Sequence, residues 1–384
     1  MTAAPDQASY AQNWGAAALL ALVSSTFSTI ASQFAAGRIG RDAFVDWMAV
    51  AAIPMRDAAL QAEPSSGVIA AGILFHQAAD FSWAVVFFGL LGRWTAALRP
   101  GTILLVAIPW AVFTSASEWF VLVPLIPFWQ PIFPLEQVYW IGLTVHLTSA
   151  SMYPLFPYLR DRVAGVRPSP NRRFAAAWAS LAAAGALALG LLAFLGWQHR
   201  ELPWVGRDPA YDQAYMRKMA AHHVQGVELA RMADQKAADP HLRALARLMI
   251  AAQNGDVRIF EQWWGSWFGG ALPPASAEEH AGMPGMLSPD EMASARAASG
   301  ADFDPLFVRL MTAHHQGAIA MANDALEHAS DPRLKLMSHG LRHAQSGEIE
   351  LMHGTEGLAA VSAATRSLLA PSDANGGGAP PHRH

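Results

Sequence analysis

The chain has 384 residues, of which 53% are hydrophobic and only 15% are charged, and its formal net charge is −4. Because soluble domains carry roughly 25% charged residues, part of this chain is expected to lie in a membrane. The slightly acidic balance gives no basic surface for nucleic acid. The absence of Cys excludes disulfides, thiolate metal sites and a Cys nucleophile.

Residues 1–200 predict a transmembrane domain of about five helices. A helix needs about 20 mostly apolar residues to cross a bilayer, and five stretches meet this condition: 13–36, 67–92, 101–125, 137–158 and 174–197. No Lys or Arg precedes Arg38, so the first stretch does not have the form of a cleavable signal peptide. A shorter apolar stretch, 42–55, is expected to lie along the membrane surface.

Arginine placement predicts the orientation of this domain. Seven residues follow the second and fourth stretches: Arg93, Arg99, Arg160, Arg162, Arg167, Arg172 and Arg173. Three residues in the first outer loop oppose them: Arg38, Arg41 and Arg56. By the positive-inside rule, the N-terminus lies in the cytoplasm and everything after residue 197 lies outside the bacterial inner (cytoplasmic) membrane, in the periplasm.

Four ionisable residues interrupt the apolar stretches, and three of them are expected at a similar depth in the outer half of the bilayer: His76, Glu118 and His146. The fourth, Asp80, follows His76 by one helical turn on the same face. Hydrogen bonding between helices would explain this polar cluster. A metal, proton or quinone-linked site is the alternative, since ionisable groups in a membrane are costly.

The second part of the chain contains an internal repeat. "MAAHHVQGVELA" (219–230) and "MTAHHQGAIAMA" (311–322) lie 92 positions apart, and the matches continue without a gap to Gln253 and Gln345. Each copy predicts two helices, the second beginning after an Asp-Pro pair that caps it. The sequence therefore predicts an all-α chain in which a soluble four-helix bundle (205–358) follows the membrane domain.

The boundaries of this bundle follow from the repeat. The copies cover 208–266 and 300–358, and a Gly- and Pro-rich linker (269–301) joins them. Ser288 and Glu291 predict a capping box within the linker. The segment 359–384 is predicted to be a disordered tail.

The Met and His residues of the bundle predict a metal site. Eleven of 15 Met and 12 of 15 His follow residue 205. On a helix, Met311 neighbours His314 and His315, as Met219 neighbours the first His pair. Thioether and imidazole ligands without thiolate suit copper, especially Cu(I). Zinc prefers His with Cys or carboxylate and is a weaker candidate, and Met as simple core filler is the structural alternative.

The segment 208–353 also resembles the bacterial DUF305 family, through "MAAHHVQGVELARMA", "MPGMLSPDEMASARAASGADFDPLFVRLMTAHHQGAIAMA" and "HAQSGEIELM". The resemblance implies a ferritin-like-looking helical domain, secreted or membrane-anchored, with members linked to copper binding and resistance. At matching positions it implies these candidate ligands: Met219, His222, His223, Met283, Met286, Met311, His314, His315, Met321 and Met352. Leu229 and Phe260 stand where the second copy has Met321 and Met352, so the first copy is expected to bind metal less well.

Three classes of function are therefore open. The first is copper capture or buffering at the membrane, with possible transfer to a copper-handling protein partner. The second is a ferritin-like redox enzyme with iron, although the Glu-x-x-His spacing of Glu350 and His353 is not duplicated. The third is a metal-free docking or sensory module attached to a transporter-like membrane domain.

Overall fold

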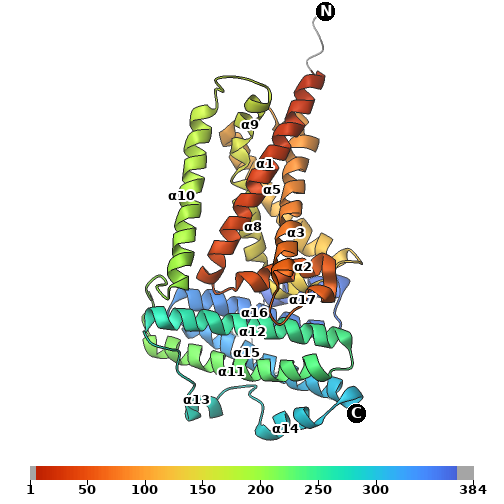
Figure 1. Ribbon diagram of the computed structural model, residues 1–384, viewed down its shortest axis with the longest axis vertical. Helices are drawn as coiled ribbons and strands as arrows, with labels where there is room; N and C mark the ends of the chain where they lie inside the picture. Colours follow the sequence, from red (N-terminus) through yellow and green to blue (C-terminus); the bar gives the residue numbers. More distant parts are fainter. Residues whose placement is uncertain (1–5, 370–384) are drawn as a thin grey trace, which may run out of the picture.

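The structure is a computed structural model that describes residues 6–369. Within this range the chain forms helices and no strands. Figure 1 shows an upright bundle built from residues up to 197, here called the N-terminal bundle, standing on four long helices that lie across its base. These four helices, within 209–352, are here called the four-helix domain. The predicted all-α fold is confirmed.

Four segments of the N-terminal bundle are long and apolar enough to cross a membrane: Ala11–Arg38, Ser66–Leu90, Pro100–Leu125 and Arg172–Trp197. They contain α1 (Asp6–Ala35), α3 (Ser66–Val85), α5 (Pro100–Ser117) and α10 (Arg172–Trp197). Helix α3 continues into a π-helical turn, η3 (Val86–Leu90), and α5 into another, η4 (Glu118–Leu122), followed by α6 (Val123–Leu125). Four of the five predicted spans are thus single long helices.

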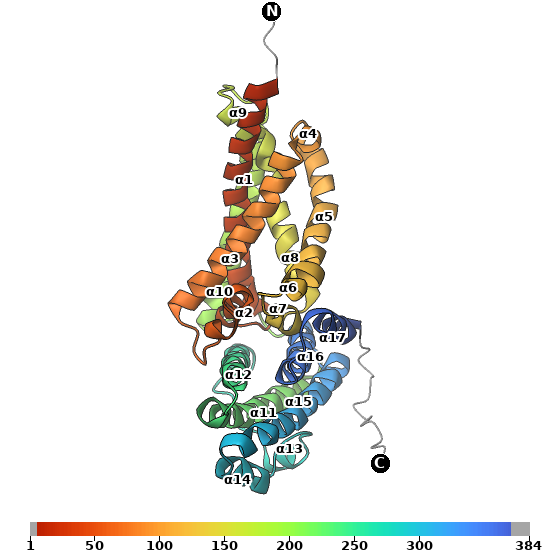
Figure 2. The same ribbon diagram turned by 90° about the vertical axis from the view of Figure 1, so that its right-hand side faces the viewer.

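The fifth predicted span, 137–158, is divided into shorter helices. Its residues form α8 (Tyr139–Ala150), a 3-10 turn η5 (Tyr153–Leu155) and the start of α9 (Phe156–Val163). Pro154 and Pro157 cause the division, because proline has no N–H to donate within a helix. The chain nevertheless returns along the bundle between α5 and α10 through these pieces (Figure 2).

Short helices join the two bodies. The stretch expected along the membrane surface forms α2 (Ala43–Met55), capped by Asp42, and most of it is buried. Helix α7 (Ile132–Glu136) lies against the four-helix domain, while α4 (Gly92–Thr95) lies at the far end of the bundle (Figure 2). The turns η1 (Ala36–Arg38) and η2 (Arg56–Ala59) flank α2. The structure therefore places α2 at a protein junction.

The three Arg residues that oppose the predicted orientation all have acidic partners. Arg38 lies 2.6 Å from Glu201, Arg41 lies 2.5 Å from Asp46, and Arg56 lies 3.4 Å from Glu356. These ion pairs lie at the end of the bundle nearest the four-helix domain. The seven Arg residues counted for the opposite end still favour the orientation proposed from the sequence.

The four-helix domain consists of two helical hairpins. Helices α11 (Pro209–Lys236) and α12 (Pro240–Trp267) form the first, and α15 (Phe303–His328) and α16 (Pro332–Met352) form the second. Asp239 and Asp331 cap α12 and α16 as predicted, with Pro in the first turn. In Figure 2, α12 and α16 face the N-terminal bundle, and α11 and α15 lie on the far side.

The linker and the tail contain further helices. The linker forms α13 (Ala277–Ala281), α14 (Pro289–Ala297) and the turn η6 (Gly300–Asp302), and the predicted capping box of Ser288 and Glu291 begins α14. The segment expected to be disordered from residue 359 instead begins within α17 (Gly357–Leu369). Ala360, Ala363 and Ala364 are buried on one face of α17, and this burial stabilises the helix. Residues 370–384 lie outside the described residues.

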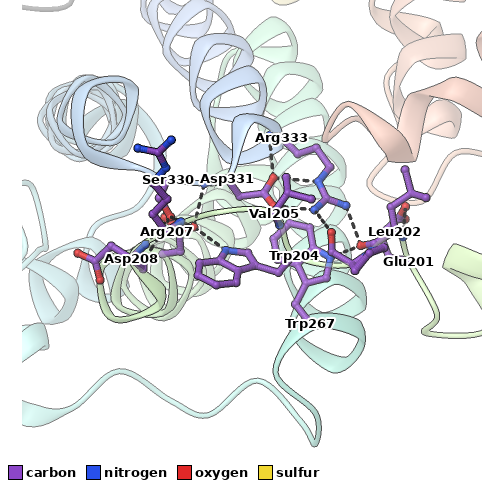
Figure 3. Close-up of polar contacts among 12 residues, drawn as sticks. Glu201, Leu202, Trp204, Val205, Arg207, Asp208, Trp267, Ser330, Asp331 and Arg333 are labelled. Atoms are coloured by element: carbon purple, nitrogen blue, oxygen red, sulfur yellow. Dashed lines mark hydrogen bonds and ion pairs between the residues drawn. The ribbon is translucent and has the colours of Figure 1, made fainter.

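The segment that connects α10 to α11 holds the two hairpins together (Figure 3). Trp204 donates its indole N–H to Asp212 at 2.9 Å. The Arg333 guanidinium donates to the carbonyls of Leu202 and Pro203 and lies 4.2 Å from the Trp267 ring centroid. Since Arg333 belongs to the second hairpin and Trp267 to the first, the connection fixes both copies of the repeat below the N-terminal bundle.

The repeated mid-helix glycines contact the N-terminal bundle. A Cβ on Gly347 would lie 2.1 Å from the Leu135 carbonyl oxygen of α7, and a Cβ on Gly255 would lie 2.9 Å from the Asp42 side chain. Both distances are too short for a real methyl group. The close approach expected from these glycines is therefore made with α7 and the cap of α2.

Gly347→Ala should weaken the junction. The added methyl group meets backbone, which cannot rotate away, so we expect a loss of about 1–3 kcal/mol in stability and a lower melting temperature. Gly185→Ala is the matched control, because nothing lies within 4 Å of its added Cβ. Thermal unfolding of the two variants in detergent measures the difference, and equal melting temperatures would contradict the contact.

Candidate metal centre in the four-helix domain

The four repeated His residues lie in the core. His222 and His223 are on α11, His314 and His315 are on α15, and each side chain is at most 1% exposed. The adjacent residues of each pair point in different directions, because neighbours on a helix differ by about 100°. His222 contacts the linker at Pro284, and His314 packs against His222. His223 contacts Asp256 of α12, and His315 lies beside Glu348 of α16. We call His222 and His314 the loop-side pair, and His223 and His315 the junction-side pair.

The loop-side pair is a close pair of imidazoles whose ring planes are tilted by 33°. The ring centroids of His222 and His314 lie 3.8 Å apart. His222 Nε2 donates to the Pro284 carbonyl at 3.2 Å, and His314 Nε2 donates to the His222 carbonyl at 3.1 Å. Since a carbonyl only accepts, each ring carries its proton on Nε2 and keeps a lone pair on Nδ1. Both Nδ1 atoms are buried without a hydrogen-bonding partner among the described residues.

The linker covers this pair with the sequence Met283-Pro284-Gly285-Met286. Added Cβ atoms on Gly285 and Gly317 would meet the opposing backbone at 2.7 Å and 2.1 Å, so only glycine permits the contact between linker and α15. Gln225 holds the linker at Leu287 by donating to its carbonyl at 3.0 Å and accepting from its N–H at 2.7 Å. Met283 and Met286 therefore lie on either side of Pro284, whose carbonyl accepts from His222 of the loop-side pair.

The junction-side pair is matched with carboxylates. His223 Nε2 donates to Asp256 at 3.0 Å. His315 Nε2 lies 2.6 Å from Glu348, but the ring is not oriented for a hydrogen bond with it. The Nδ1 atoms of both rings, and both carboxylate oxygens of Glu348, are buried without hydrogen-bonding partners in the described chain.

Burial favours the neutral form of His222, His314 and His315. Loss of solvation, followed by the charge of His223, lowers the pKa of His222 and of His315 to about 3. The pKa of His314 also falls well below its usual value, first through burial and then through His222. Burial raises the pKa of Glu348 to about 8, and Asp256 adds to this rise. Near neutral pH His222, His314 and His315 can therefore act as uncharged ligands.

The candidate thioethers divide between two sides of the core. Met219, Met283 and Met321 are buried in one hydrophobic cluster, with Met286 packed against it. Met311 and Met352 belong to a different cluster. The six candidate Met residues therefore do not share one cluster: four belong with the cluster that contains Met219, and Met311 and Met352 are packed elsewhere.

The donor types restrict the metal that could bind. Among residues 6–369, no three His, Asp or Glu side chains gather closely enough to hold a metal ion. A closed zinc site of the usual four ligands has no basis in this arrangement. Two neutral imidazoles with nearby thioethers fit a soft ion such as Cu(I).

The residues considered for a di-iron enzyme lie at the surface end of α16. Glu350 accepts a hydrogen bond from the Thr355 hydroxyl at 2.7 Å and lies 3.6 Å from Arg366. His353 is exposed. A di-iron centre needs inward-facing ligands from several helices, so this pair does not supply one.

The polar residues of the N-terminal bundle form two pairs. His76 lies 3.6 Å from Asp80, and His146 lies 3.2 Å from Glu118. Both pairs lie apart from the four-helix domain.

Two further buried polar residues, Gln253 and Glu136, lie outside the set of ligands predicted from the sequence. Gln253 has both amide atoms buried without partners, and a Cβ on Gly226 would meet its amide oxygen at 2.3 Å. Glu136 on α7 is buried, and burial followed by the charge of Glu348 raises its pKa well above the ordinary value. The repetition of Gln253 as Gln345 was a usable signal, and Glu136 could have been noticed as a lone acid in an apolar region.

Comparisons with known proteins agree on the C-terminal part of the chain. The family model "Domain of unknown function (DUF305)" matches residues 212–355, and no family model matches the N-terminal half. No curated protein matches the chain significantly.

Several solved structures are similar to the same part. A putative secreted DUF305 protein from Streptomyces coelicolor is 28% identical, with 37% of this chain and 88% of that chain covered and a TM-score of 0.33. A DUF305 fragment from Deinococcus radiodurans is 29% identical, with 40% and 97% covered and a TM-score of 0.35. CopM in its Cu(I)-bound form is 29% identical, with 37% and 93% covered and a TM-score of 0.32. Residues 212–355 of this chain are therefore a DUF305 domain, as the sequence resemblance indicated.

Proposed function

We propose that this protein binds copper, as Cu(I), in its four-helix domain and holds it at the outer face of the cytoplasmic membrane. The four buried Nδ1 atoms of the repeated His residues, which have no partners among the described residues, carry this proposal. Buried polar groups are nearly always satisfied, so a group of orphaned ligand atoms in one core points to an ion or water that completes it.

The loop-side pair is the proposed capture site. His222 and His314 offer neutral imidazole nitrogens, and Met283 and Met286 offer sulfur on the linker that covers them. Pro284 between these two Met residues is exposed, so an ion from the surrounding solution meets the linker first. CopM has been solved in a Cu(I)-bound form, and for this chain the proposal rests on the residues named above.

The remaining parts of the proposal concern place and role. The four apolar segments support anchoring of the domain to the membrane, and the Arg distribution supports its location in the periplasm. A site that captures Cu(I) there would buffer copper and contribute to resistance, with transfer to a copper-handling partner as a further step. The orphaned Nδ1 atoms of the junction-side pair would extend the site toward α12 and α16.

Cu(I) titration of the copper-free full chain in detergent tests the proposal. The protein should compete with a chromophoric Cu(I) chelator and saturate, and a variant with all four repeated His changed to Gln should not compete. His328→Gln is the control, since that exposed side chain bonds only on the surface of α15. Failure of the unchanged protein to compete, or equal competition by the four-residue variant, would overturn the proposal.

A further inference from the structure

A cavity of about 650 Å³ lies inside the N-terminal bundle, in the half nearer the four-helix domain. Most of its wall is apolar, and these aromatic residues contribute to it: Trp47, Phe75, Trp83, Trp119, Trp129 and Trp140. A cavity of this size with mainly aromatic walls and a few polar groups is typical of a site for one small molecule. The cavity is separate from the proposed copper site, which lies in the other domain.

One polar group on the wall is a fixed carboxylate. Glu118 accepts from the Trp83 indole N–H, and its other oxygen lies 3.2 Å from His146 Nε2. His146 Nδ1 in turn lies 2.9 Å from the Thr114 hydroxyl. The Glu118 side chain keeps 23% of its surface exposed and lines the cavity. A ligand in the cavity can therefore reach a carboxylate whose position is already set by two neighbours, Trp83 and His146.

The second polar group is an imidazole with a free acceptor. His76 Nε2 lies 3.1 Å from the Ser28 hydroxyl and 3.6 Å from the Asp80 carboxylate. The Ser28 hydroxyl donates to Asp80, so its oxygen is left to accept from His76. Nε2 therefore carries the ring proton, and Nδ1 keeps a lone pair that no described residue occupies. His76 also lines the cavity.

The backbone is irregular at this wall. Glu118 and Trp119 belong to the π-helical turn η4, and Val86, which also lines the cavity, begins the other π-helical turn, η3. Such turns are rare and occur often at functional sites, because the extra residue redirects the side chains of the turn. Two of them beside one cavity support a binding function for it.

The wall chemistry narrows the class of ligand. No Lys or Arg lines the cavity, so an anionic lipid headgroup would find no partner there. Asp46, the other carboxylate on the wall, is paired with Arg41 at 2.5 Å, and Glu118 is already paired, so a cationic ligand is not required for charge balance. Glu118 and His76 offer two hydrogen-bond acceptors among the aromatic rings. Apart from Asp46 and the indoles, the other polar groups of the wall are uncharged hydroxyls, the Gln137 amide and the His146 ring that is paired with Glu118. The two acceptors suit a neutral planar ring that carries hydroxyl donors.

We propose that this cavity binds a membrane-soluble quinol. The ring lies among the tryptophans, and the hydroxyl groups donate to Glu118 and to His76 Nδ1. An oxidised quinone has carbonyl acceptors in place of these donors and therefore binds more weakly.

Binding of an alkyl-hydroxyquinoline N-oxide, a redox-stable quinol mimic, to the copper-free full chain in detergent tests this proposal. Its fluorescence should be quenched to saturation, and decylubiquinol should displace it better than the oxidised decylquinone does. Glu118→Gln keeps the shape of the side chain and should weaken binding about tenfold, since one acceptor oxygen is lost. Ser117→Ala, on the same helix and outside the cavity wall, should leave binding unchanged.

A second variant tests the location. Ala79 lines the cavity, and Ala79→Phe should fill it and abolish saturable quenching while the melting temperature stays within a few degrees of the original. Absence of saturable binding by the unchanged protein would overturn the proposal, as would unchanged binding in both Ala79→Phe and Glu118→Gln. Displacement by tetraphenylphosphonium in preference to decylubiquinol would overturn it in favour of a lipophilic cation.

Discussion

Changing His222 and His314 together to Gln should weaken Cu(I) binding by at least about 100-fold, since two ligand nitrogens are lost. The Gln side-chain amide can place an N–H near the position of Nε2, so it keeps a donor for the Pro284 and His222 carbonyls. What it removes is the Nδ1 lone pair. The change therefore separates the role of a ligand from the role of a hydrogen-bond donor in the core.

The junction-side pair provides the matched comparison. His223→Gln with His315→Gln removes the same atoms from the same two helices, but on the side of the carboxylates Asp256 and Glu348. We expect a smaller loss of Cu(I) affinity, because the proposed sulfur ligands Met283 and Met286 are part of the linker and belong to the site of the loop-side pair. Chelator competition measures both variants. Equal affinity of the loop-side variant and the unchanged protein would show that this pair is not the Cu(I) site.

Much of the fold could be predicted because its signals are local. The 92-residue repeat, the Asp-Pro caps and the apolar stretches depend on neighbouring residues, and α11, α12, α15 and the first part of α16 follow them. The second copy of the repeat is predicted to extend to residue 358, but its second helix, α16, ends at Met352. The residues between it and α17 include Gly354, which adopts a positive φ of 72° that favours glycine.

The candidate site was predictable in its residue types but not in its arrangement. Helical spacing shows that Met311 and His314 share a face, yet it does not show which cluster that Met joins. The contact of Pro284 with His222 depends on where a loop with two glycines folds back, which is a tertiary effect. The approach of the Leu135 carbonyl of α7 to Gly347 is likewise a tertiary effect that the local sequence does not predict.

The junction explains why the two domains are joined in one chain. His343 of α16 donates from Nε2 to the Pro134 carbonyl at 2.9 Å, and His241 of α12 lies 2.9 Å from Asp57 of η2. With Glu136 facing the charge of Glu348, the contact between the domains is rich in titratable groups. Protonation is therefore expected to change the stability of this junction. A junction made only of apolar residues would not respond to pH in this way.

The metal-free full chain should be most stable near pH 6.5 and lose stability steeply below it. Burial lowers the pKa of His222 and His315 to about 3 and that of His343 to about 4, whereas in the unfolded chain each titrates near 6.5. Between these values the unfolded chain binds protons that the folded chain does not. Each His therefore removes about 1.4 kcal/mol of stability for every pH unit below 6.5.

Glu348 has the opposite effect. Its pKa of about 8 in the fold lies above the ordinary value of 4.5, so between these values the folded chain holds a proton that the unfolded chain has lost. Stability from this group is full below pH 4.5 and falls as the pH rises toward 8, again by about 1.4 kcal/mol per unit. Glu136, whose pKa is also raised, acts in the same direction as Glu348, and His314 acts in the same direction as the other three His. Below pH 6.5 the four His outweigh the two Glu, and above pH 6.5 the effect of the two Glu remains. The stability of the metal-free chain is therefore expected to be greatest near pH 6.5, above which the His residues no longer lower it.

Thermal unfolding followed by circular dichroism between pH 4.5 and 8.5 measures this profile. Glu348→Gln should remove much of the decline above pH 6.5 and leave the steep fall at lower pH. Cu(I) should raise the melting temperature across the whole range, because imidazoles with a pKa near 3 remain free to bind it at pH 5. A melting temperature that stays constant from pH 6.5 to 5 would contradict the burial of neutral His residues in this core.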